Sequence, residues 1–142
     1  MNKKQPLVID SSVIVKWVNT YKEEGVDQAN KILEDAKAEK VELFTSEVAK
    51  YEVGNALLVK KGLDLTPAYI SLGTVYNLPL NFVPETLPLA ESTYKIGQEL
   101  KITYYDASFL SVAEQLGAVL VTDNVKHHGK STKVKVIPLK DY

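Results

Sequence analysis

Four acidic residues stand where a carboxylate is well placed for chemistry. The first, Asp10, directly follows the apolar run Leu7-Val8-Ile9 and precedes the apolar positions Val13 and Ile14 of an expected helix. Ligands of open parallel sheets bind at the carboxyl ends of the strands, so an acid at this corner is a candidate catalytic or metal-binding group. Its alternative role is to cap the helix that follows.

The second candidate, Glu52, lies in a segment of helical period. Its neighbours three and four residues away include Val48, Asn55 and Ala56, which places the acid on the apolar face. A carboxylate on that face is desolvated unless it is paired or bound to a metal ion, which favours a functional role. The alternative is a glutamate at the edge of the stripe, paired with a lysine.

The remaining candidates are Asp106 and Asp123. Asp106 falls in the first turn of an expected helix, where it has the spacing of a capping box with Thr103. Asp123 follows the run Ala118 to Thr122, again at the carboxyl end of an expected strand, where a turn-forming residue is the ordinary expectation.

The conjunction of these acids decides between the readings. Two carboxylates about 4 Å apart repel each other by roughly 4 kcal/mol at an effective dielectric constant of about 20, so a cluster of acids requires cations. Carboxylate and water oxygens are the ligands that Mg²⁺ or Mn²⁺ prefers. We therefore expect Asp10, Glu52, Asp106 and Asp123 to meet in one divalent-metal site.

The elements that must position these residues alternate between strands and helices. Expected strands are short apolar runs, at residues 7–9, 41–44, 80–83, 118–121 and 134–137, and expected helices include 24–40, 46–61 and 103–116. The first run and the run 118–121 are apolar at successive positions, as in central strands covered on both faces. This pattern predicts an α/β three-layer sandwich with about five mainly parallel strands.

Composition predicts a single globular domain, residues 1–142. The chain is 45% hydrophobic and 25% charged, with no cysteine, which excludes disulfides and thiolate metal sites. The N-terminus lacks the features of a signal peptide and no apolar run is long enough to span a bilayer, so we expect a cytoplasmic protein with no membrane contact.

The C-terminal part is locally basic, although the net charge is −1. Lysines between Lys126 and Lys135 would contact an RNA backbone, or alternatively lie in a solvated loop and edge strand. His127 and His128 are interpreted as surface residues, because adjacent histidines in a polar loop are usually exposed. A role as Mg²⁺ ligands is not expected, since Mg²⁺ does not favour imidazole.

The combination of motifs resembles the PIN-domain family, and in particular the VapC-type toxins of prokaryotic toxin–antitoxin pairs. The matching segments are LVIDSSVIVKWV with Asp10 and Ser12, EVAKYEVGNAL with Glu52, YYDASFLSVAEQLGA with Asp106, and LVTDN. The resemblance implies a five-stranded parallel sheet, Mg²⁺-dependent endoribonuclease activity, dimerisation and inhibition by an antitoxin.

One position departs from the family pattern. The last acid often stands two residues after the threonine, where this chain has Asn124, and Asp123 comes one residue early. Successive strand residues point to opposite faces, so both side chains can enter the site only if the strand has already ended. Ser12 and Thr122 are candidate hydroxyl donors that orient the carboxylates.

Two other functions are compatible with parts of the pattern. A phosphoacceptor receiver module also carries acids at strand ends, but it needs paired acids near its first strand, where this chain has two serines after Asp10. The altered last motif keeps open a catalytically silent PIN-like domain that binds RNA or acts as a scaffold.

Overall fold

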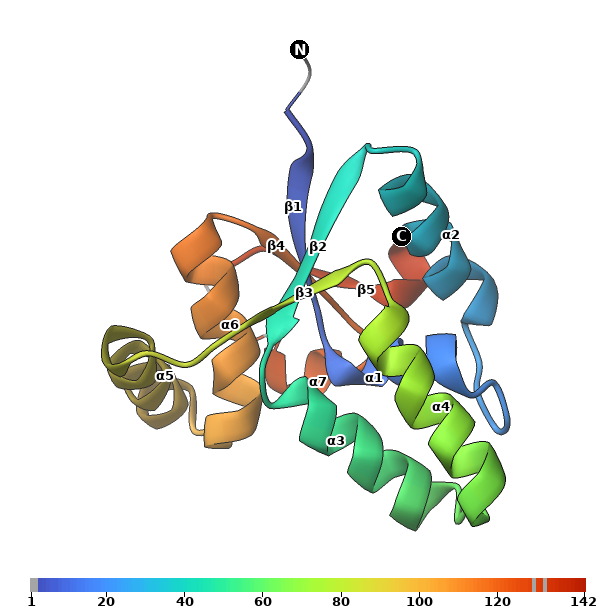
Figure 1. The fold of residues 1–142 in the computed structure, drawn as a ribbon. Helices are drawn as coiled ribbons and strands as arrows, with labels where there is room; N and C mark the ends of the chain where they lie inside the picture. Colours follow the sequence, from blue (N-terminus) through green and yellow to red (C-terminus); the bar gives the residue numbers. More distant parts are fainter. Residues whose placement is uncertain (1–2, 129, 132) are drawn as a thin grey trace.

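The computed structural model describes residues 3–128, 130–131 and 133–142, and these form a parallel sheet between two layers of helices (Figure 1). All strand pairs in this part of the chain are parallel, in the order β3-β2-β1-β4-β5. The strands are β1 (Gln5–Ile9), β2 (Val41–Ser46), β3 (Leu80–Val83), β4 (Val119–Thr122) and β5 (Val136–Pro138). The predicted fold class is confirmed.

The helices cover both faces of this sheet. In Figure 1, α5 and α6 lie on one side of it and α2 and α4 on the other, while α1 and α3 lie near the carboxyl ends of the strands. Their bounds are α1 (Ser11–Val18), α2 (Val26–Lys37), α3 (Ala49–Asn55), α4 (Leu65–Asn77), α5 (Leu87–Leu100), α6 (Tyr104–Leu116) and α7 (Val125–His128). A π-helical segment, η1 (Ala56–Lys60), extends α3, and a short 3₁₀ turn, η2 (Leu139–Asp141), follows β5.

The central strands are apolar at successive positions because helices pack against both of their faces. Val8, Ile9, Leu120 and Val121 are all fully buried. β1 is the middle strand of the sheet and β4 is hydrogen-bonded to it, as predicted from these runs.

Helix α6 links the core to the carboxyl edge of the sheet. Thr103 caps its first turn, with the hydroxyl oxygen accepting a hydrogen bond from the amide of Asp106 at 3.0 Å. Phe109 and Leu110 then bury completely against the sheet. The helix ends at Gly117, whose φ of 60° is in the left-handed region that glycine adopts without strain.

Several boundaries differ from those expected. The helix predicted over 46–61 begins at Ala49, because Ser46 ends β2 and its hydroxyl accepts a hydrogen bond from the Val48 amide. Helices α4 and α5 were not individually predicted. None of the helices in the described residues is both long and apolar enough to cross a membrane.

The buried sheet predicts the energetics of two leucine substitutions. Leu120→Ala is expected to lower the free energy of unfolding by about 2–5 kcal/mol, because it leaves a cavity in the core between the sheet and one of its helical layers. Leu58→Ala, at a side chain 71% exposed on η1, should change it by no more than about 0.5 kcal/mol. Urea denaturation measures both, and equal losses would contradict this description of the core.

Candidate active site

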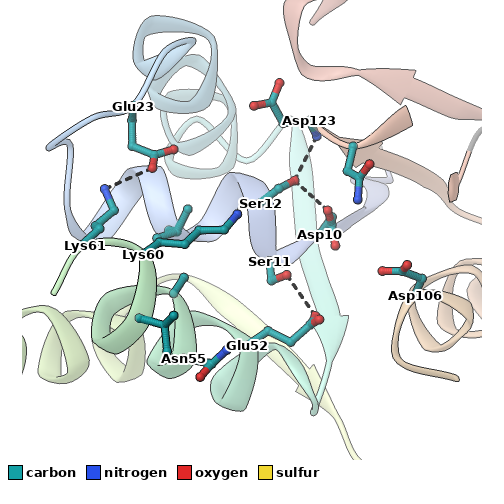
Figure 2. Close-up of a pocket in the computed structure, with 14 residues that line it drawn as sticks. Asp10, Ser11, Ser12, Glu23, Glu52, Asn55, Lys60, Lys61, Asp106 and Asp123 are labelled. Atoms are coloured by element: carbon teal, nitrogen blue, oxygen red, sulfur yellow. Dashed lines mark hydrogen bonds and ion pairs between the residues drawn. The ribbon is translucent and has the colours of Figure 1, made fainter. Parts of the chain in front are cut away.

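The four predicted acids line one cavity of about 670 Å³ at the carboxyl edge of the sheet. Asp10 follows β1, Asp123 follows β4, and Glu52 and Asp106 come from α3 and α6. Figure 2 shows the side chains of Asp10, Glu52 and Asp106 turned toward a common space between α1, α3 and α6. Residues distant in the sequence therefore meet where the parallel strands end.

Asp10 is held by two hydroxyl groups. Its side chain is 3% exposed and makes no capping hydrogen bond, although it occupies the N-cap position of α1. Ser12 donates to Oδ2 at 2.6 Å and Thr122 donates to the same oxygen at 2.9 Å. No described residue donates to Oδ1, so the carboxylate is oriented while one of its oxygens remains available.

Glu52 experiences the charge of the other acids. Burial raises the pKa of its carboxyl above the ordinary value of 4.5, and the negative charges of Asp10 and Asp106 raise it further, against a hydrogen bond from Ser11 that lowers it. That hydrogen bond is 3.0 Å long and ends on Oε1. No lysine within the described ranges pairs with Glu52, which removes the alternative of an edge glutamate in an ion pair.

Asp106 does not complete the capping box that its spacing suggested. The Thr103 hydroxyl accepts a hydrogen bond from the Asp106 backbone amide, but among the described residues the Thr103 backbone amide donates no hydrogen bond to the Asp106 carboxylate. The carboxylate is 18% exposed and lines the cavity instead.

Asp123 and Asn124 both line the cavity, because β4 ends at Thr122 and the alternation of the strand no longer applies. Their contacts differ. The Asp123 side chain is 50% exposed and lies 3.1 Å from the ammonium of Lys16, while its backbone amide donates to Ser12 at 3.0 Å. The Asn124 amide donates to the Thr122 hydroxyl at 2.9 Å.

A network of buried charges beside the acids was not anticipated. The Lys16 ammonium lies 3.0 Å from Glu23, and Lys61 lies 3.1 Å from the other oxygen of that carboxylate (Figure 2 draws the second contact). Burial would lower the pKa of Lys16, but Glu23 and Asp123 raise it above 10.5. Burial would likewise raise the pKa of Glu23, but the two lysines lower it below 4.5. A lysine within the apolar helix pattern of residues 11–18 was the available signal for this network.

The interpretation of His128 as a surface residue was wrong. The residue is fully buried, with its ring packed edge to face against Phe109 at a centroid distance of 5.9 Å. Its Nε2 atom lies 3.9 Å from Asp106 Oδ1. Adjacent histidines in a polar segment gave no signal of burial, because the short helix α7, which turns one of them against Phe109, was not predicted.

The donor set suits a hard divalent cation bound partly through water. Oxygen atoms of carboxylates and an amide surround the cavity, which is the chemistry that Mg²⁺ or Mn²⁺ requires. Among the described residues, no group of three or more acid or histidine side chains is gathered closely enough to hold one ion directly. One or two direct carboxylate ligands and several waters are common for Mg²⁺, so the residues fit such an ion.

The fold and the cavity define an α/β protein with an acidic site at the carboxyl edge of a parallel sheet. Residues 7–129 match the family described as PIN domain, and the chain belongs to that family. This membership replaces the receiver-module alternative. A comparison with curated proteins finds no match.

Solved structures share the fold over about four-fifths of the chain or more. A chain of a toxin–antitoxin complex from Klebsiella pneumoniae is 20% identical, with 96% of this chain and 99% of that chain covered and a TM-score of 0.68. PAE2754 from Pyrobaculum aerophilum is 26% identical, with coverages of 96% and 90% and a TM-score of 0.64. VapC20 from Mycobacterium tuberculosis, described as a toxin that cleaves the sarcin–ricin loop, is 17% identical, with coverages of 79% and 84% and a TM-score of 0.60.

The raised pKa of Glu52 predicts the direction of a pH effect on stability. The folded protein binds a proton at Glu52 more readily than the unfolded chain, so stability is lost as pH rises from 4.5 through the folded-state pKa. Glu52→Gln should therefore raise the melting temperature of the metal-free protein by a few degrees at pH 7, with the difference shrinking toward pH 4.

The matched control is Glu91→Gln, at an exposed glutamate of α5, which should leave the melting temperature unchanged at both pH values. Thermal unfolding followed by circular dichroism gives the comparison. A Glu52→Gln protein less stable than the parent at pH 7 would contradict the electrostatic description of the cavity.

Proposed function

We propose that this protein is a divalent-metal-dependent endoribonuclease that acts as the toxin of a type II toxin–antitoxin pair. The observation that carries the proposal is the convergence of Asp10, Glu52 and Asp106 on one open cavity of a PIN-domain protein. A cavity lined by carboxylates repels the phosphates of a nucleic acid unless cations lie between them. Metal-assisted hydrolysis of a phosphodiester is the chemistry that such a site supports best.

Each residue of the site has a distinct role in this proposal. Asp10 and Asp106 would hold Mg²⁺, or Mn²⁺ in its place, directly or through water, and Glu52 would complete the pocket. Ser12 and Thr122 hold Asp10 by Oδ2 and so fix the direction of its other oxygen. The bound cation would activate water and stabilise the charge that develops on the phosphodiester.

Asp123 has a supporting role in this proposal. Lys16 neutralises its carboxylate, while its amide holds the Ser12 hydroxyl that in turn donates to Asp10. The backbone at Asp123 thus contributes to the orientation of Asp10, and among the four acids its side chain is the one paired with a lysine. The segment LVTDN therefore keeps a hydrogen-bonded link to Asp10 through Ser12, although its acid stands one residue before the position that is usual in the family.

The partners follow from the family. RNA as substrate is supported by the likeness to VapC20, which is described as cleaving the sarcin–ricin loop, and an antitoxin is supported by the likeness to chains from toxin–antitoxin complexes. A homodimer is the assembly we propose for the free toxin. The lysines near the C-terminus, including Lys126 and Lys133, are exposed, while Gly129 and Thr132 of that segment lie outside the described residues.

Asp10→Asn tests the catalytic centre directly. The substitution keeps the shape of the side chain but removes its charge, so Mg²⁺-dependent cleavage of RNA should fall by at least about 100-fold. Asp27→Asn, at an exposed position of α2 that does not line the cavity, should cleave at the parental rate. Gel-based cleavage of a labelled RNA, with and without chelator, measures both.

Parental cleavage by Asp10→Asn would refute the site. Cleavage by neither the parent nor the control, with metal ion and RNA both bound, would favour a silent RNA-binding domain instead.

Asp123→Asn separates the fourth acid from the other three. Because its carboxylate is paired with Lys16 and its backbone amide survives the substitution, activity should fall by less than about 10-fold. The same cleavage assay gives the value. A loss as large as that of Asp10→Asn would identify the Asp123 carboxylate as a direct metal ligand.

A further inference from the structure

His128 is a buried side chain that the proposed chemistry does not use. Its Nδ1 atom lies 3.2 Å from the carbonyl oxygen of Asn124 and 3.3 Å from the hydroxyl oxygen of Thr122. Its Nε2 atom is buried and has no hydrogen-bond partner among the described residues. The nearest carboxylate oxygen recorded for it is Asp106 Oδ1, at 3.9 Å.

The contacts of Nδ1 determine which ring nitrogen carries the proton. The Asn124 carbonyl can only accept a hydrogen bond, and Thr122 has already given its hydroxyl hydrogen to Asp10. Nδ1 is therefore the donor in both contacts. In the neutral ring, Nε2 then carries a lone pair directed away from the donors and toward Asp106.

This arrangement is the one that metal-ligating histidines adopt. Such residues almost always donate one ring N–H to a carbonyl or carboxylate, which fixes the ring and leaves the other nitrogen free for the ion. Bonds from a transition-metal ion to histidine nitrogen and to carboxylate oxygen are each about 2.0–2.2 Å. One ion therefore reaches both Nε2 and Asp106 Oδ1 across their separation of 3.9 Å.

We propose that His128 Nε2 and Asp106 form a cation position beside the cavity, which Asp106 lines, and that this position favours a first-row transition metal over Mg²⁺. Imidazole nitrogen suits ions such as Zn²⁺, Fe²⁺ and Co²⁺, whereas Mg²⁺ selects oxygen ligands. Asp106 would face both this position and the oxygen-lined part of the cavity. The inference rests on the proposed function only in treating Asp106 as a metal ligand.

The hydrogen bonds also connect this position to the other main acid. The Thr122 hydroxyl accepts from His128 and donates to Asp10, so the ring and the Asp10 carboxylate share one support. An ion on Nε2 would hold the ring in place and, through Thr122, the Asp10 carboxylate with it. His128 would then help to position both Asp10 and Asp106.

The test uses Co²⁺ alone on the metal-free protein labelled with ¹⁵N-histidine. The chain has two histidines, so any imidazole that ligates Co²⁺ is one of two residues. We expect one histidine with strongly shifted ring signals in the NMR spectrum. His127→Asn, a change at the neighbouring and partly exposed histidine, should keep that signal, and His128→Asn should lose it.

Calorimetry provides a second readout that a merely structural role would not move. His128→Asn retains a donor near Nδ1 but lacks Nε2, so Co²⁺ affinity should fall at least about 10-fold while Mg²⁺ affinity stays within about 3-fold of the parent. A variant that fails to fold would lose both ions. In that case the parent and His127→Asn spectra decide the matter by themselves.

Co²⁺ binding without any shifted histidine signal in the parent would overturn the inference, and would indicate that His128 only supports Thr122. Mg²⁺-dependent RNA cleavage in the same protein would leave the proposed function standing. Absence of both Co²⁺ and Mg²⁺ binding would instead remove the basis of both proposals.

Discussion

Mutual repulsion among carboxylates is the constraint around which this structure is organised. Asp10, Glu52 and Asp106 face one partly buried cavity, where the dielectric screening of bulk water is reduced and like charges interact more strongly. The protein meets this cost with fixed hydroxyl donors and not with positive charge at the three acids themselves. Ser12 and Thr122 orient Asp10, and Ser11 holds Glu52. The balance that remains is negative, which is the condition for binding a cation.

Positive charge is kept to one side of the cavity. Lys16 and Lys61 share Glu23, and Lys16 also holds Asp123. Buried ion pairs of this kind contribute more to geometry than to net stability, because desolvation offsets much of their attraction. In this protein they fix α1 against the loop that precedes α2 and the residue that follows β4. The acid nearest to the lysines is thereby neutralised, and the other three keep their charge.

Much of the fold was predictable because strands covered on both faces have an unmistakable pattern. The runs around Ile9 and Leu120 identified the central strands, and an acid after each run identified the edge of the sheet at which the four acids line one cavity. The convergence of Glu52 and Asp106 on that edge was also predictable, since an acid on an apolar helix face must meet something polar inside the protein. These inferences depend on local periodicity, which a single sequence contains.

Features that depend on tertiary packing were not predictable. His127 and His128 are adjacent residues of the same type, so the sequence does not distinguish them. The packing of α7 against Phe109 buries His128 and leaves His127 partly exposed. The end of β4 at Thr122, which lets both Asp123 and Asn124 line the cavity, is likewise set by pairing with β5. Glu23, one of the two partners of Lys16, lies in a polar loop with no periodic pattern that would predict the contact.

Thermal unfolding of the protein with and without Mg²⁺ tests the central claim most directly. If the carboxylates form a cation site in the native state alone, saturating Mg²⁺ should raise the melting temperature of the parent, and Asp10→Asn should reduce that rise sharply. A parent whose melting temperature does not respond to Mg²⁺ or Mn²⁺, or an equal response in Asp10→Asn, would contradict the account.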